Sequence, residues 1–189
     1  MAEPEEKWDK FSLDLPPNHG WKARPGYKIF VADRGAMRFD FPEGWVVVPG
    51  KEAIALHDRP PPDDGVVLKV SVMRLPPVKG GWGQLPLELL VREATRNDSR
   101  GASGGETVTN LRRGDLELAW TELHFIDPNE KRPALSRCCV ARARNIQPLI
   151  TMDFWESDRE KFSPAWDEVL RTLQVGVPLG DPRRGDVMN

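Results

Sequence analysis

The sequence predicts an α+β domain in which an antiparallel β-sheet of about six strands is flanked by helices, as an α/β/α sandwich. Three observations favour this fold class. Short segments with an apolar residue at every second position recur from Tyr27 onward. The last two of these segments are joined by a connection short enough to make them antiparallel neighbours. A strong apolar stripe with helical spacing then follows near the C-terminus.

The first strands are predicted between residues 27 and 57. Residues 27–31 and 37–41 carry alternating apolar side chains, which is typical of strands. Residues 46–48 resume the pattern after a Pro-Glu-Gly break, and residues 52–57 alternate again. The proline run that follows lacks backbone donors, so it ends the last of these strands.

A half-buried strand is next predicted over residues 66–75, where apolar residues alternate with Lys69 and Ser71. A helix is predicted from Pro86 to about Asp98, because apolar residues recur at helical spacing. The turn signal Gly114-Asp115 predicts a second hairpin.

The second hairpin is predicted to pair residues 107–112 with residues 116–126. The apolar positions of the longer segment change parity near Thr121 and Glu122. This change predicts a β-bulge or a strong twist at that point.

Two more strands, over residues 135–143 and 148–155, precede the final helix. Ser157 and Glu160 have the spacing of a capping box, and Ser163-Pro164 offers a second start. The helix is predicted to end near Gln174.

The periodic pattern divides the chain into three parts. Residues 1–26 mix charges, prolines and isolated apolar residues, and are interpreted as an N-terminal arm. Residues 27–176 form the single predicted domain. Residues 177–189 have no period and are expected to be a flexible tail.

Composition limits the partners and the compartment. The chain has 189 residues, 39% of them hydrophobic, which suffices for one domain with its own core. Its 27 basic and 29 acidic residues leave a formal net charge of -2, so we expect no nucleic-acid partner. Neither a secretory signal nor an apolar stretch of about 18 residues is present, so we expect a cytoplasmic protein without membrane insertion.

The residues that commonly carry chemistry do not form known motifs. Cys138 and Cys139 are adjacent on a predicted strand, so their side chains point to opposite faces and are interpreted as reduced packing residues. The three histidines, His19, His57 and His124, are isolated, so neither a metal site nor a cofactor is expected. His57 beside Asp58 lacks an assignable nucleophile, and we therefore expect no catalytic residues.

Four residues are candidate contacts for a partner or a ligand. Glu122 and His124 share a strand face, and with Trp155 they are candidates to line a pocket between sheet and helix. The alternative is an ordinary polar outer face. Trp82 lies in a glycine-rich loop, where it either offers contact area to a partner or folds back over the helix that follows.

Several arginines are predicted to gather on a sheet face or edge. These are Arg112, Arg113, Arg137, Arg142 and Arg144. They either bind an acidic partner or only solvate the surface and discourage edge pairing.

The phrase FDFPEGW at residues 39–45, together with the order of the elements and the helix at 162–173, resembles the PsbP-like superfamily. That superfamily includes a photosystem extrinsic subunit, the Ran-binding Mog protein and the bacterial DcrB group with its secretion-effector chaperones. The resemblance covers roughly residues 27–175. It implies an antiparallel sheet with helices on its faces and, in general, protein binding without catalysis.

These observations lead to one main hypothesis and two alternatives. The main hypothesis is a non-catalytic protein-binding or adaptor protein. The first alternative is a chaperone for a secreted effector, for which we expect a homodimer with a concave apolar sheet face. The second is a small-ligand-binding protein or enzyme with a pocket near His124 and Glu122.

Overall fold

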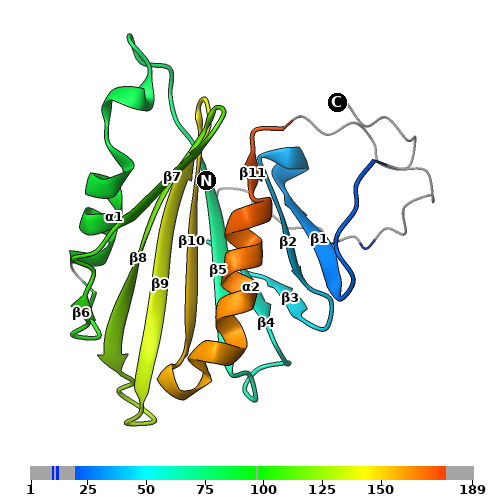
Figure 1. Cartoon of the computed structure of the whole chain (residues 1–189), viewed down its shortest axis with the longest axis vertical. Helices are drawn as coiled ribbons and strands as arrows, with labels where there is room; N and C mark the ends of the chain where they lie inside the picture. The colour runs from blue at the N-terminus through cyan, green and yellow to red at the C-terminus, as the bar shows by residue number, and fades with distance from the viewer. Residues whose placement is uncertain (1–9, 11, 13–19, 97, 178–189) are drawn as a thin grey trace, which may run out of the picture.

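The computed structural model describes residues 10, 12, 20–96 and 98–177, and it contains two antiparallel sheets and two α-helices (Figure 1). The smaller sheet has the order β1-β2-β11, with β1 (Tyr27–Ala32), β2 (Met37–Pro42) and β11 (Gln174–Val175). The larger, eight-stranded sheet has the order β3-β4-β5-β10-β9-β8-β6, and β7 pairs with β8 beside β6. Its strands are β3 (Val46–Pro49), β4 (Ile54–His57), β5 (Val66–Arg74), β6 (Ser103–Gly104), β7 (Thr109–Arg113), β8 (Leu116–Ile126), β9 (Pro133–Arg142) and β10 (Ile146–Trp155).

The predicted fold class, an antiparallel sheet with helices, is correct. The predicted number of strands is wrong, because the structure has an eight-stranded and a three-stranded sheet in place of one sheet of about six strands. The first two predicted strands pair with each other, from Tyr27↔Pro42 to Ala32↔Met37, and do not join the large sheet. The C-terminal strand β11 completes this separate sheet by pairing with β2. Alternation along a strand reports its buried face but not its neighbours, so the sequence pattern does not reveal a second sheet.

The FDFPEGW phrase connects the two sheets. Phe39 and Phe41 on β2 are buried in the core, and Pro42 ends that strand. The chain then enters the large sheet at β3, and the Trp45 ring packs edge-on against Phe162 with centroids 6.5 Å apart. The signature that carries the family resemblance is therefore a structural junction.

Helix α2 (Arg159–Thr172) packs on one face of the large sheet and against β2 (Figure 1). Its Trp166 is fully buried, and the indole contacts the Trp120 ring at 5.6 Å between centroids. Phe162 reaches Phe154 of β10 in the same way. These contacts build the main core, which both sheets share with α2.

The predicted start of α2 is wrong in detail. A 3-10 turn, Glu156–Asp158, occupies the expected capping box, and the Arg159 N-H bonds the Glu156 carbonyl. The Asp158 side chain makes no capping hydrogen bond. Pro164 does not start the helix but lies inside it, on an exposed position where water can satisfy the freed carbonyl.

Helix α1 (Leu87–Arg96) packs on the opposite face of the large sheet, mainly over β8 and β9. Leu87 and Val91 pack there against Ala119 and Val140 as a second, smaller cluster. In the described part of the chain, no helix covers this face over β10, β5, β4 and β3, where large hydrophobic side chains are partly exposed. These are Val48, Met73 and Leu149.

The two covered faces explain the parity change in β8, and of the two predicted causes, a bulge or a strong twist, the bulge is wrong. The pairing of β8 with β9 is continuous from Glu117↔Arg142 to Ile126↔Pro133. Leu116 and Leu118 belong to the main core, whereas Ala119 belongs to the α1 cluster. Because both faces of β8 are buried in its middle, the apolar pattern changes face without a backbone defect.

The adjacent cysteines are free and buried, one on each face of β9. Cys139 belongs to the main core. Burial raises the pKa of the Cys138 thiol to about 11, and burial raises the pKa of Cys139 further. Both side chains are therefore kept as thiols at neutral pH.

Among the described residues, none of the helices has the length and apolar character needed to span a membrane.

Candidate functional site

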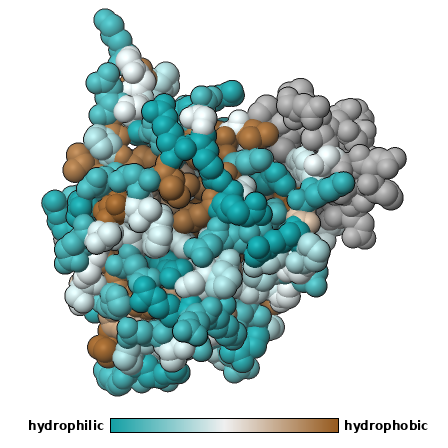
Figure 2. Space-filling view, viewed as in Figure 1, coloured by the Kyte–Doolittle hydropathy of each residue, from teal (hydrophilic) through white to brown (hydrophobic). Residues whose placement is uncertain are grey.

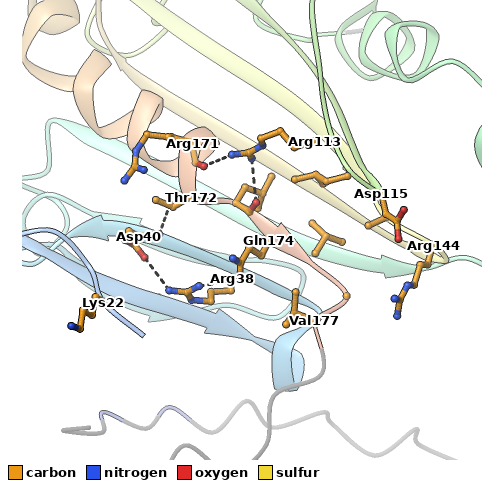
Figure 3. A pocket seen from close by; sticks show the side chains of 15 residues that line it. Lys22, Arg38, Asp40, Arg113, Asp115, Arg144, Arg171, Thr172, Gln174 and Val177 are labelled. Atoms are coloured by element: carbon orange, nitrogen blue, oxygen red, sulfur yellow. Dashed lines mark hydrogen bonds and ion pairs between the residues drawn. The ribbon is translucent and has the colours of Figure 1, made fainter. Parts of the chain in front are cut away.

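A groove of about 760 Å³ lies where the small sheet, the end of α2 and the β7–β8 and β9–β10 turns meet (Figure 3). Its polar lining residues are Lys22, Arg38, Asp40, Arg113, Asp115, Arg144, Arg171, Thr172 and Gln174. The apolar ones are Leu116, Ala143, Leu173, Val175 and Val177, with Gly176 between the last two. We call this feature the basic groove, because five of its side chains are basic and two are acidic.

Arg113 is placed by the β7–β8 hairpin, which directs its guanidinium onto the C-terminus of α2. The guanidinium donates to the carbonyls of Leu170 at 2.6 Å, of Leu173 at 3.2 Å, and of Arg171. The negative end of the helix dipole and the unpaired last carbonyls favour a cation there. All three partners are neutral, so the hydrogen bonds are satisfied while the charge of Arg113 is not cancelled by an anion.

Arg38 on β2 is similarly engaged with a neutral partner. It donates to the Gln174 side chain at 2.9 Å, and its nearest carboxylate oxygen, on Asp40, is 3.8 Å away. Its Nε is buried without a hydrogen-bond partner among the described residues. The charge of Arg38 is therefore opposed by Asp40 only through a long ion pair, without a hydrogen bond between them.

Two buried carboxylates lie beside the groove with opposite pKa shifts. Burial raises the pKa of Asp40 above its ordinary value of 3.8, and the charge of Arg38 only partly opposes this. Hydrogen bonds from Arg171, at 2.7 and 2.9 Å, lower the pKa of Glu168 below its ordinary 4.5. Arg171 is thus the groove cation that a carboxylate neutralises directly.

Lys22 and Arg144 are both exposed and lie at opposite ends of the groove in Figure 3. Within the described part of the chain, neither makes a hydrogen bond or an ion pair with another residue. Arg144 adopts a left-handed conformation, with φ of 54°, in the tight β9–β10 turn. These two side chains are available to a ligand.

The structure separates the five arginines that were predicted to gather on one sheet face or edge. Arg137 is buried and pairs with Glu122 at 2.8 Å, and Arg142 is buried and pairs with Glu117 at 3.0 Å. Arg112 is exposed. Arg113 and Arg144 alone of the five line the groove.

The structure brings Glu122 and His124 together on the α2 face of the sheet, and it places Trp155 on the other face. Glu122 accepts from Arg137 at 2.8 Å and from Arg159 at 2.6 Å. His124 lies 3.9 Å from Glu122 and 3.5 Å from Glu156. Trp155 is covered by the Arg132 guanidinium, 4.4 Å from its ring centroid.

Trp82 is half-buried in its loop, where its indole N-H donates to the Pro76 carbonyl at 2.7 Å.

His57 does not pair with Asp58. Its Nδ1 lies 2.8 Å from Asp64, while Asp58 accepts from the backbone N-H groups of Gly65 and Val66. This His57–Asp64 pair closes the proline-rich loop between β4 and β5.

The molecular surface shows where polar and apolar side chains are exposed. In Figure 2 the exposed side of α2 is mostly hydrophilic, and hydrophobic residues come into view between α1 and α2.

The basic groove was not predicted from the sequence, because its five cations come from five separate segments of the chain. The only local signal was the pair of arginine-rich hairpin ends, at 112–113 and 142–144.

Solved structures confirm the fold predicted from the resemblance. Cyanobacterial PsbP (CyanoP) from Synechocystis superposes with a TM-score of 0.59 at 16% identity, over 82% of this chain and 98% of that one. LpqN of Mycobacterium tuberculosis, a protein involved in cell envelope biogenesis, gives 0.53 at 11% identity, over 79% and 90%. At these identities the likeness defines a shared PsbP-like fold.

Sequence comparison defines the family more closely. The uncharacterized protein alr1449 of Nostoc is 41% identical over 180 residues, which is 95% of this chain and 93% of the relative. The Alr1449 family model matches residues 28–179, which span both sheets and both helices. The chain therefore belongs to the Alr1449 family.

Proposed function

We propose that this protein is a non-catalytic binding protein that holds an anion-bearing protein partner in the basic groove. The observation that carries the proposal is the excess of basic side chains in the groove, which five basic and two acidic residues line. Arg113 bonds neutral backbone carbonyls, and Arg38 bonds Gln174 and lies 3.8 Å from Asp40. Lys22 and Arg144 have no hydrogen-bond or ion-pair partner among the described residues. This local charge stands against a formal net charge of -2 for the chain, so it favours anions at one place only.

The state of the reactive side chains supports binding over catalysis. The Glu122 carboxylate is bound by two arginines, Arg137 at 2.8 Å and Arg159 at 2.6 Å, so its oxygens are already engaged. The two thiols are buried, and burial raises the pKa of each, which disfavours the nucleophilic thiolate. His57 has a carboxylate partner in a loop-closing pair.

Affinity capture from the native cell tests the proposal. The tagged full chain is compared with the double variant Lys22→Glu/Arg144→Glu and with Lys69→Glu, which reverses an exposed charge on the opposite face of the large sheet. We expect the same partner with the wild type and Lys69→Glu, and its loss with the double variant. Equal capture by all three proteins would contradict the groove as the binding site.

A chaperone that acts as a homodimer is the second candidate. It is favoured by the open half of the large sheet, where Val48, Met73 and Leu149 are 38%, 58% and 36% exposed. Size-exclusion chromatography with light scattering tests it, and a dimer lost in Met73→Glu would support it. A strictly monomeric wild type would remove this candidate.

A further inference from the structure

Asp40 is a buried carboxylate in the wall of the basic groove. Its side chain is 4% exposed, and in Figure 3 it lies between Thr172 and Arg38, toward the end of the groove that Lys22 lines. The backbone N-H of Asp40 donates to the Thr172 hydroxyl at 2.8 Å, whereas the side-chain Oδ1 has no hydrogen-bond partner among the described residues. A buried carboxylate with so few hydrogen bonds is costly to keep charged.

The charged groups around Asp40 come from three segments of the chain. Strand β2 contributes Arg38, the end of α2 contributes Glu168 and Arg171, and the segment before β1 contributes Arg24. Arg171 donates to Glu168 at 2.7 and 2.9 Å, and Arg24 lies 3.4 Å from the same carboxylate, so these two cations are directed at Glu168. Asp40 is left with the long ion pair to Arg38 at 3.8 Å, and its burial raises its pKa above 3.8.

We infer that the basic groove binds its anion together with a proton, which the Asp40 carboxylate takes up. This inference rests on the proposed function and adds the regulation of the same site. As a carboxylate, Asp40 partly neutralises Arg38 and repels an anion in the groove, whereas the neutral acid does neither. Because linkage is reciprocal, an anion that favours the protonated form is bound more tightly as the pH falls through the pKa of Asp40.

The other carboxylates in and beside the groove are less suited to this role. Asp115, the second acidic residue of the described lining, is exposed in the β7–β8 turn, where water solvates its charge. Glu168 lies beside the groove, and hydrogen bonds from Arg171 lower its pKa, so it stays ionised. Asp40 is therefore the groove carboxylate whose protonation burial favours.

Isothermal titration calorimetry of the full chain with inorganic sulfate tests the inference, because sulfate keeps its charge from pH 5 to pH 7. At constant ionic strength we expect the wild type to bind sulfate about fivefold more tightly at pH 5 than at pH 7. Asp40→Asn, which is neutral at both pH values, should bind about equally at both. Asp167→Asn makes the same change at an exposed position outside the groove lining and should keep the pH dependence of the wild type.

Titrations in two buffers of different ionisation enthalpy add a direct readout of the proton. Sulfate binding should be accompanied by proton uptake in the wild type and in Asp167→Asn, and by none in Asp40→Asn. Circular dichroism at both pH values verifies that each protein is folded.

The possible outcomes separate this inference from the proposed function. Sulfate binding that is absent at pH 5, or that has the same pH dependence in the wild type and Asp40→Asn, would overturn the proton coupling. If the coupling is missing while the double variant Lys22→Glu/Arg144→Glu still loses its cellular partner, this inference fails and the proposed function stands. If the double variant retains both sulfate binding and its cellular partner, both fail.

Discussion

Single arginine side chains link elements that are far apart in the sequence. Arg113 connects β7 to the end of α2, and Arg137 connects Glu122 of β8 to Ser163 of α2. Arg142 reaches from β9 to the Leu85 carbonyl before α1. The planar guanidinium with its several donors suits these multiple contacts better than a lysine would.

Removing the Arg113 guanidinium should destabilise the fold. Arg113→Ala leaves the carbonyls of Leu170, Arg171 and Leu173 without their cation, and we expect a loss of about 2 kcal/mol in the free energy of unfolding. Urea unfolding followed by circular dichroism measures it. The neighbouring Arg112 is 75% exposed and lies 3.8 Å from Glu117, so Arg112→Ala should cost less than about 0.5 kcal/mol. Similar losses in both variants would contradict the capping role.

The two buried carboxylates beside the groove should respond to pH in opposite directions. Burial raises the pKa of Asp40, so its ionisation opposes folding, and this penalty appears as the pH rises through 3.8 to the raised pKa. Asp40→Asn removes the penalty, so the variant should gain stability relative to the wild type between acid and neutral pH. Equilibrium unfolding at pH 3.5 and pH 7 measures the difference between the two proteins, and a difference that does not change with pH would contradict burial as the cause of the raised pKa.

Glu168→Gln provides the matched opposite case. Hydrogen bonds from Arg171 lower the pKa of Glu168, so its contribution to stability is present above pH 4.5 and is lost as the pH falls through the lowered pKa. The variant should therefore be less stable than the wild type at pH 7, with a smaller deficit at acid pH. A deficit that grows toward acid pH would contradict the assignment.

The cysteines should be unreactive in the folded protein. Both are buried, and burial raises the pKa of Cys138 to about 11, so little thiolate is present at pH 8. We expect Ellman's reagent to label neither thiol in buffer and both thiols in guanidinium chloride. Rapid labelling without denaturant would show that β9 is not buried on both faces.

At the scale of elements, α2 joins the two sheets into one core. It contacts β2 of the small sheet and β10 of the large one. Trp166 is fully buried at its centre. Because the helix packs on both sheets, its apolar stripe is wider than contact with one sheet would need.

Truncation of Trp166 should be among the most costly single changes. Trp166→Ala removes the contact with the Trp120 ring and leaves a cavity, and we expect a loss of about 4 kcal/mol. Chemical denaturation of the variant measures the loss. The adjacent Asp167 is exposed, so Asp167→Ala should change stability by less than about 0.5 kcal/mol. An unchanged unfolding midpoint in Trp166→Ala would contradict the packing of α2.

At the scale of the whole molecule, the large sheet separates a large core from a small one. Among the described residues, the cluster under α1 contains four buried ones, Leu87, Val91, Ala119 and Val140. Little apolar surface therefore holds α1 in place, whereas α2 and the central strands share the main core. The two helices are expected to differ in local stability.

Native-state amide hydrogen exchange measures this difference. Amides of α1 should exchange through local opening, at a free energy below that of global unfolding. Amides of α2, β9 and β10 should exchange only with global unfolding. Equal protection of α1 and α2 would contradict the division into two cores.

The amino-acid sequence by itself predicted nine of the eleven strands of the described structure, both helices and the family resemblance, but neither β6 nor β11. Alternation at 27–31 or a stripe at 162–173 arises from neighbours a few residues apart, so local spacing reveals it. The resemblance rests on the FDFPEGW phrase, the order of the elements and the helix at 162–173, all of which can be recognised from local patterns.

Only the tertiary structure decided which strands share a sheet and which cations share a groove. The small sheet pairs Met37 with Val175, and the groove gathers Lys22, Arg113 and Arg144 from separate segments. The cause of the parity change in β8 also became clear only in the structure, where α2 packs on one face of that strand and α1 on the other. Pairing and charge clustering depend on long-range contacts, whereas side-chain periodicity records only whether each position is buried.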